Sequence, residues 1–167
     1  MALLEHHGQF GLGGEIVSLG LLFLRLIAGG IFAAHGYGKL FGGPGKPVHP
    51  LAARHLGAGF VQSVQNGPAG FVETLRRLEV QEPETVATFV GGAEFFGGLS
   101  LMLGLFTRLA ALLLSGDMAV AISKVHWRNG LIAQGGYEFP LSMLGACLAL
   151  LFGGAGKLSL DRMLGPW

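Results

Sequence analysis

Hydrophobic residues gather along the chain in four long blocks, which short stretches rich in glycine, proline and charged residues separate. The first three blocks each hold about 20 residues, the length that an α-helix needs to cross a bilayer. Continuous apolar blocks of this length favour helices over half-buried strands, which alternate apolar and polar positions. The pattern therefore predicts an all-α, integral membrane four-helix bundle. We expect one transmembrane domain over residues 1–167, with spans at about residues 16–41, 85–105, 108–126 and 137–152.

The connections between these blocks predict how the spans are ordered. A very tight turn at Phe106-Thr107-Arg108 makes the second and third spans an antiparallel hairpin. The first span ends at the helix-stopping run Gly42-Gly43-Pro44-Gly45-Lys46-Pro47. Two mildly amphipathic pieces follow, at residues 51–65 and 71–78, split by Asn66-Gly67-Pro68. We expect short helices here that lie on the membrane surface or cap the bundle.

Composition supports a membrane protein and narrows its partners. Charged residues make up 13% of the chain, whereas soluble domains carry roughly 25%, so lipid is the expected surrounding. A net charge of +1 gives no basic surface for a nucleic acid. The single cysteine, Cys147, excludes an internal disulfide and a cysteine-rich metal site. We therefore predict no metal and no intrinsic cofactor.

Three ionisable residues interrupt the apolar spans, at Arg25, Glu94 and Asp117. Counting a rise of about 1.5 Å per residue from the expected span ends places all three roughly 13–16 Å deep. Charges at this depth are expensive and usually face a bundle interior or a wet cavity. We predict one buried charge network, which either fixes the helix register as an ion pair or triad or carries a proton. One arginine against two acids leaves a surplus negative charge, which predicts a retained proton or a further donor.

A second polar layer lies near one end of the predicted spans. His35 and Lys39 share a helix face, and Lys124 and His126 end the third span at a similar depth. A pocket with histidine and lysine suits a quinone head group, which needs hydrogen bonds and protons at its carbonyl oxygens. The alternatives are an ordinary membrane boundary with lysines that reach toward water, and a haem with His35 and His126 as axial ligands.

Several short motifs together resemble the DoxX family of small bacterial and archaeal membrane proteins. The resemblance extends over about residues 20–162, and its first matching residue is Arg25 in the first span. Its pieces are His35-Gly36-Tyr37-Gly38-Lys39-Leu40-Phe41, Ala93-Glu94-Phe95-Phe96-Gly97-Gly98, Leu103-Gly104-Leu105-Phe106-Thr107-Arg108-Leu109-Ala110-Ala111 and Gly153-Gly154-Ala155-Gly156-Lys157-Leu158-Ser159-Leu160-Asp161. The resemblance implies a four-helix bundle in the plasma membrane. It also implies a link to redox chemistry, because the family name comes from a membrane subunit of a thiosulfate:quinone oxidoreductase.

These observations support three functional hypotheses. The leading one is a membrane subunit that works with a quinone-linked oxidoreductase, with protein partners in a larger complex. The second is a non-catalytic subunit that anchors such a complex, and the third is a small proton-coupled transporter. Lys and Arg are more frequent at the end of the bundle that holds the 42–84 connection, so we expect this end in the cytoplasm.

Overall fold

The computed structural model describes the backbone of residues 2–165 and the side chains of residues 13–165, so the ends of the predicted domain, residues 1 and 166–167, lie outside the described residues. The described residues form helices and no strand, so the predicted all-α class is confirmed. The helices are α1 (Ala2–Phe41), α2 (Pro50–Arg77), α3 (Pro83–Leu103), α4 (Thr107–Val120), α5 (Glu138–Gly153) and α6 (Leu160–Leu164). Helix α4 continues as a π-helical segment, Ala121–His126, and a 3-10 turn, Trp127–Asn129.

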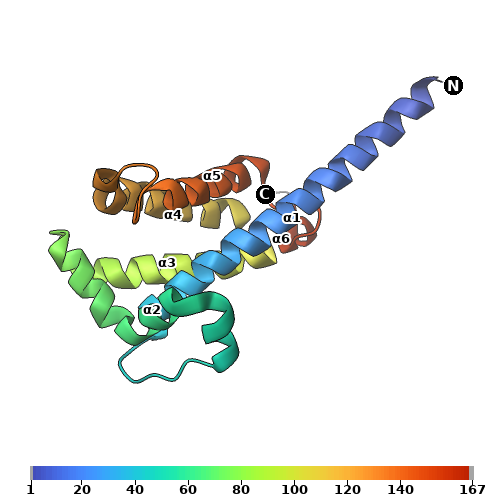
Figure 1. The fold of residues 1–167 in the computed structure, drawn as a ribbon. Coiled ribbons are helices and arrows are strands. Elements are labelled where there is room, and N and C mark those ends of the chain that lie inside the picture. The colour runs from blue at the N-terminus through green and yellow to red at the C-terminus, as the bar shows by residue number, and fades with distance from the viewer. Residues whose placement is uncertain (1, 166–167) are drawn as a thin grey trace.

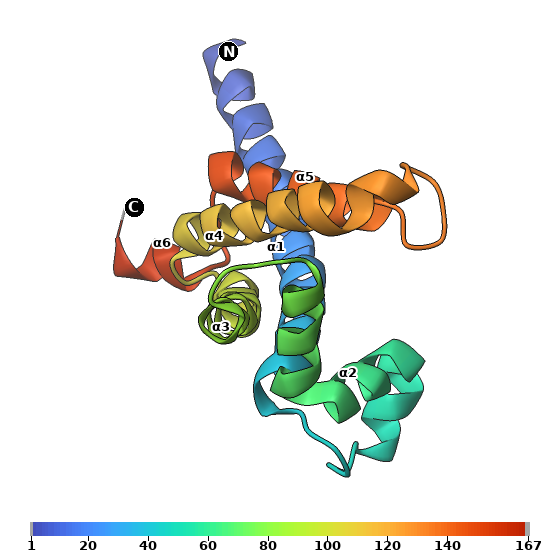
Figure 2. The ribbon, with the colours of Figure 1, turned by 90° about the vertical axis from the view of Figure 1, so that its left-hand side faces the viewer.

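The long helices pack as two pairs (Figure 1). Helix α1 crosses α3 obliquely, and α4 lies along α5. The turn between α3 and α4 is as tight as predicted, because Gly104 and Phe106 adopt left-handed backbone conformations with φ of 66° and 50°. Figure 2 shows α2 beside the last turns of α1, with its first half turned away from the α4–α5 pair. Because α3 and α4 are joined by this tight turn and contact each other, the second and third predicted spans form the expected hairpin.

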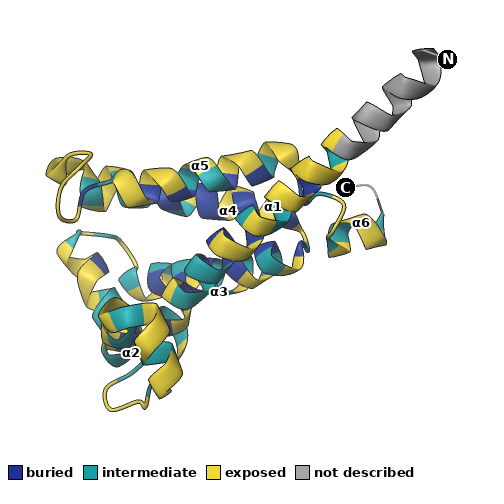
Figure 3. Ribbon diagram, turned by 45° about the vertical axis from the view of Figure 1, so that its right-hand side comes forward, coloured by how far each residue is buried: buried dark blue, intermediate teal, exposed yellow. Residues whose placement is uncertain are grey.

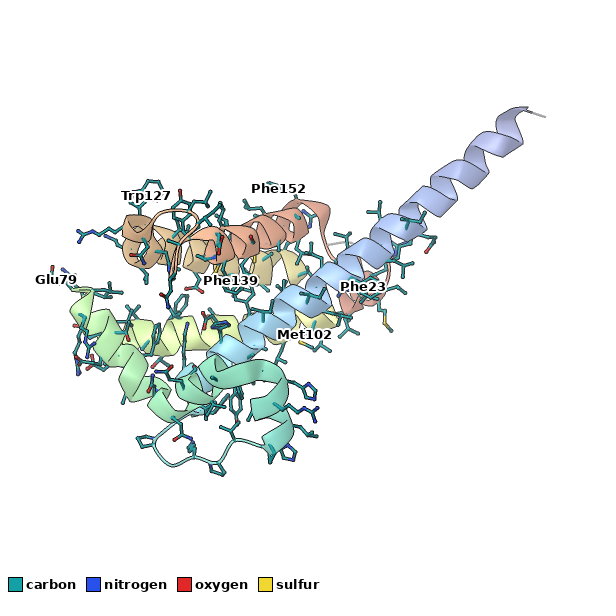
Figure 4. All side chains as sticks on the ribbon, in the orientation of Figure 1. Phe23, Glu79, Met102, Trp127, Phe139 and Phe152 are labelled. Atoms are coloured by element: carbon teal, nitrogen blue, oxygen red, sulfur yellow. The ribbon has the colours of Figure 1, made fainter. Side chains whose placement is uncertain are left out.

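Three helical stretches are long and apolar enough to cross a membrane: Gly13–Phe41, Pro83–Leu103 and Thr107–Asn129. Helix α5 is apolar but has 16 residues, slightly fewer than the roughly 17–25 of a typical span. Many large hydrophobic residues are exposed, and Figure 3 shows exposed positions along the outer faces of the helices. Phe23 and Phe152, labelled in Figure 4, are 62% and 75% exposed. Such a surface fits lipid, not water, so this is a membrane protein. The number of crossings stays a prediction.

Small residues bring α1 and α3 into backbone contact. A Cβ atom added to Gly98 would lie 2.5 Å from the Ala33 nitrogen, and one on Gly29 would lie 2.5 Å from the Gly98 carbonyl oxygen. In lipid, where apolar burial drives little association, such close approach supplies the van der Waals contact that holds helices together. The α1–α3 contact also fixes which polar residues of the two helices meet.

The connection after α1 is helical, as expected, and has one break more than the sequence predicted. Helix α2 runs from Pro50 to Arg77 but is kinked at Gly57 and Gly67, whose φ values are 80° and 58°. The second kink occurs at the predicted break, where Gly67 meets the backbone of Gly42. The predicted capping role is consistent with this placement, since α2 covers the last turns of α1.

Candidate functional site

The centre of the site is an ion pair between α1 and α3. The Lys39 ammonium lies 2.6 Å from Glu94 Oε1, and the Glu94 side chain is only 5% exposed. Lys39 also lies 4.4 Å from the centroid of the Phe71 ring on α2, so an aromatic face covers the cation. A short pair in such surroundings is shielded from water and is screened little by salt.

Asp117 adds a second carboxyl group to this ion pair. It lies on α4, half-buried, close to Glu94, Lys39 and His35. The Glu94 and Asp117 carboxyl groups are within hydrogen-bonding reach of each other. Glu94 Oε2 and Asp117 Oδ2 are buried and find no donor among the described side chains. Two of the three predicted network members are thus brought together, with Lys39 as their cation.

The structure places Arg25 elsewhere, which corrects the predicted Arg25–Glu94–Asp117 network. Arg25 is fully buried, but its guanidinium donates to the carbonyl oxygens of Leu101 and Leu158. The depth estimate failed because it counted from Ile16, whereas α1 already begins at Ala2. The register is set by the Gly29–Gly98 contact, which places Arg25 opposite the C-terminal end of α3.

The C-terminal segment completes the surroundings of Arg25. Asp161 accepts hydrogen bonds from the backbone N–H groups of Phe106 and Thr107, at 2.7 and 2.9 Å. These N–H groups begin α4 and have no partner within the helix, so Asp161 acts as its cap. The Asp161 N–H in turn donates to the Gly104 carbonyl oxygen at 2.8 Å. Through these bonds and the one from Arg25 to Leu158, the C-terminal segment connects the α3–α4 turn to α1. We call residues 154–161 the C-terminal latch.

We call Lys39, Glu94 and Asp117 the carboxyl cluster. His35 lies beside this cluster and also lines a cavity. The cavity, of about 460 Å³, lies between α1 and the first half of α2. Its walls include Ile27, Ile31, Leu56 and Phe60, and a second histidine, His55, lines it as well. The His35 ring is 6.0 Å from that of Phe139, which is labelled on α5 in Figure 4.

The structure does not bring the four predicted pocket residues together. Lys39 forms an ion pair with Glu94, and Lys124 is exposed on the π-helical segment. His126 Nδ1 lies 2.7 Å from the Gly135 carbonyl oxygen, which holds the loop after α4. Of these residues, His35 alone lines the α1–α2 cavity.

Two residues of the site were missed from the sequence, His55 and Phe71. Both lie on α2, whose path back over α1 depends on the kinks at Gly57 and Gly67. Their signal was weak, since a lone histidine and a lone phenylalanine in an amphipathic piece look like ordinary surface residues. The described side chains contain no group of three or more His, Cys, Asp and Glu residues arranged to hold a metal ion.

Comparison with known proteins identifies the family. The DoxX family model matches residues 20–127, which include α1 from its middle onward, α2, α3 and α4. The chain belongs to the DoxX family. The match contains Lys39, Glu94, Asp117 and His35, so every residue of the carboxyl cluster and its neighbouring histidine lies in the family region.

A relative of this DoxX-family protein is described as an uncharacterized protein of Haemophilus influenzae. The two are 36% identical over 74 residues, which are 44% of this chain and 49% of the relative. The chain thus spans about half the length of the curated relative it matches. No solved structure matches the chain. Family membership and a membrane location follow from these findings, and the biochemical role rests on the site itself.

Proposed function

We propose that this DoxX-family protein is a multi-pass subunit of a quinone-linked oxidoreductase complex in a bacterial or archaeal plasma membrane. Helices α1, α3 and α4 with its π-helical extension would cross the bilayer, and α5 would complete a four-helix bundle. The observation that carries this proposal is the α1–α2 cavity, which combines apolar walls with two histidines.

The chemistry of the cavity fits a quinone head group. Ligand pockets in proteins typically measure about 300–1,000 Å³, and this cavity is about 460 Å³. Ile27, Ile31 and Phe60 offer apolar contact with a ring, while His35 and His55 could each donate a hydrogen bond to one carbonyl oxygen. Gly30 and Gly59 leave room on opposite walls. When bound, the quinone would supply electron-accepting chemistry, and the two histidines would orient it.

Quinone retention tests this proposal directly. We expect the full-length protein, purified in mild detergent, to retain quinone that organic extraction and mass spectrometry detect. His35→Ala and His55→Ala should each reduce retention at least tenfold, about the effect of losing one hydrogen bond of roughly 1.4 kcal/mol. His49→Ala is the matched control, because His49 caps α2 outside the cavity. Absence of quinone from the wild-type protein, even after reconstitution with added ubiquinone or menaquinone, would refute the assignment.

A second function, that of a non-catalytic anchoring subunit, is favoured by the outer face of α5. Gly145 and Ala149 are exposed there, one turn apart, and a Cβ atom added to Gly145 would meet nothing within 4 Å. A helix of another protein could pack closely on this face. Co-purification with a stoichiometric partner, lost in Gly145→Leu but retained in Glu94→Gln, would support anchoring. Loss in Glu94→Gln alone would count against it.

A further inference from the structure

The carboxyl cluster has one more negative charge than its surroundings balance. The titratable groups that face it are His35 and Lys39 from α1, Glu94 from α3, Asp117 from α4 and Cys147 from α5. Helix α2 contributes the uncharged Phe71 ring. One ammonium group therefore stands against two carboxyl groups. An uncompensated charge in a buried site is strongly unfavourable.

The hydrogen-bond inventory of the cluster points the same way. Glu94 Oε1 takes the Lys39 ammonium, whereas Glu94 Oε2 and Asp117 Oδ2 have no donor among the described residues. Ionised carboxylates only accept hydrogen bonds, so two of them cannot bond to each other. A single proton between Glu94 and Asp117 would satisfy both atoms and neutralise the surplus charge.

We propose that Glu94 and Asp117 share one exchangeable proton, and that His35 is the outlet through which this proton reaches the α1–α2 cavity. The two acids hold the proton between α3 and α4, with Lys39 fixing the second charge. This inference does not depend on a quinone being the ligand of the cavity. It assigns a proton-holding site to this protein.

His35 is placed to serve as the outlet. It precedes Lys39 by one helical turn, lies close to Asp117 and lines the cavity. Its ring can accept a proton at one nitrogen while releasing another from the second. In the transfer, the carboxyl O–H bond breaks, an N–H bond forms on the imidazole, and the acid pair keeps one more negative charge. Release of a proton to water in the cavity restores the neutral ring, and the reverse steps reload the pair.

Infrared spectroscopy on the full-length protein in lipid nanodiscs, without added quinone, tests this site. A protonated carboxyl group gives a carbonyl stretching band that shifts in D₂O. We expect the wild-type protein to show this band at neutral pH. Both Glu94→Gln and Asp117→Asn should abolish it, because either variant leaves one carboxylate paired with Lys39. Glu84→Gln, at the exposed start of α3, is the matched control and should leave the band unchanged.

Two further variants separate proton holding from a merely structural role. Lys39→Met removes the balancing cation, so the pair should take up a second proton and the band should grow. His35→Ala should leave the band in place but slow its exchange in D₂O by about tenfold or more. A wild-type protein without the band, or a band that persists in both Glu94→Gln and Asp117→Asn, would overturn the proposal. Unchanged exchange in His35→Ala would overturn the outlet. Since no readout involves quinone, these results are independent of the proposed function.

Discussion

Arg25 illustrates how a single charged residue is accommodated in a membrane bundle. Its side chain is completely buried, and its two terminal nitrogens donate to the carbonyl oxygens of Leu101 in α3 and Leu158 in the C-terminal latch. Leu101 lies in the last turn of α3, where its carbonyl oxygen also accepts from the Gly104 N–H, and Leu158 lies in the loop before α6. A carbonyl oxygen has two lone pairs and can accept a second hydrogen bond. The guanidinium thereby closes the bundle at the α3–α4 turn. Arg25 therefore lies apart from the carboxyl cluster and connects parts of the bundle to each other.

Replacing Arg25 should destabilise the fold without affecting the carboxyl cluster. Arg25→Met keeps much of the side-chain volume but loses both hydrogen bonds. Bonds to charged groups contribute about 1.5–3 kcal/mol each, so we expect a clear drop in thermal unfolding temperature in detergent. Arg128→Met, at an exposed position, is the control and should unfold like the wild type. Equal stability of Arg25→Met and wild type would show that the latch contributes nothing.

At the scale of elements, the α1–α3 contact depends on glycine at specific positions. Gly98 lies against the α1 backbone, whereas a Cβ atom on Gly92, two turns earlier on the same helix, would meet nothing within 4 Å. The two glycines therefore differ in packing while sharing one helix. This contact sets the register that pairs Lys39 with Glu94.

Alanine at Gly98 should destabilise the fold, whereas alanine at Gly92 should not. Gly98→Ala would push α1 and α3 apart, and overpacking of this kind costs about 1–3 kcal/mol. Gly92→Ala adds helix propensity and no clash, so it should be neutral or slightly stabilising. Unfolding in detergent followed by circular dichroism measures both. Similar stability for the two variants would contradict the close contact.

The cap of α4 is a second element-scale feature. Asp161→Ala removes both hydrogen bonds to the N–H groups of Phe106 and Thr107. We expect a loss of about 1–2 kcal/mol, typical of a lost helix cap. Asp161→Asn keeps one acceptor oxygen and should lose less. If the alanine and asparagine variants were equally stable, the carboxylate would not act as the cap.

At the scale of the whole molecule, the two ends of the bundle differ in charge. Helix α2 lies at one end and carries Arg54, Arg76 and Arg77, while the C-terminal latch and α6 lie at the other. From the positive-inside rule we expect the α2 end in the cytoplasm. The cytoplasmic end would then be the one nearer Lys39 and Phe71.

Cysteine labelling tests this orientation. The natural Cys147 is buried, so Cys147→Ser gives a silent background. In that background, Arg76→Cys should react with a membrane-impermeant maleimide only after cells are opened. Met163→Cys, at an 80% exposed position of α6, should react in intact cells. The proposed crossings α3, α4 and α5 lie between the two positions, and an odd number of crossings puts the positions on opposite sides. Labelling of both positions from the same side would contradict this topology.

Helices α1, α3, α4 and α5 could be predicted from the sequence because they are apolar blocks bounded by glycine, proline or a tight turn. The hairpin at Phe106 followed from the same local signals. The partners of the charges could not be read, because they depend on how α1 and α3 cross. That crossing depends on the contact of Gly29 with Gly98. It pairs Glu94 with Lys39 and not with Arg25, which lies about four helical turns earlier on α1. Likewise, His55 reaches the cavity only because α2 bends at glycines, and no periodic pattern encodes such a bend.

The C-terminal latch has a consequence for biogenesis. Leu158 supplies an acceptor for Arg25, and Asp161 caps α4, yet both residues emerge from the ribosome after every long helix has been made. Until then the guanidinium sits in the nascent bundle without that acceptor. Insertion therefore has a late closing step, and a chain that stops short of Leu158 would leave an incomplete bundle that membrane proteases could recognise.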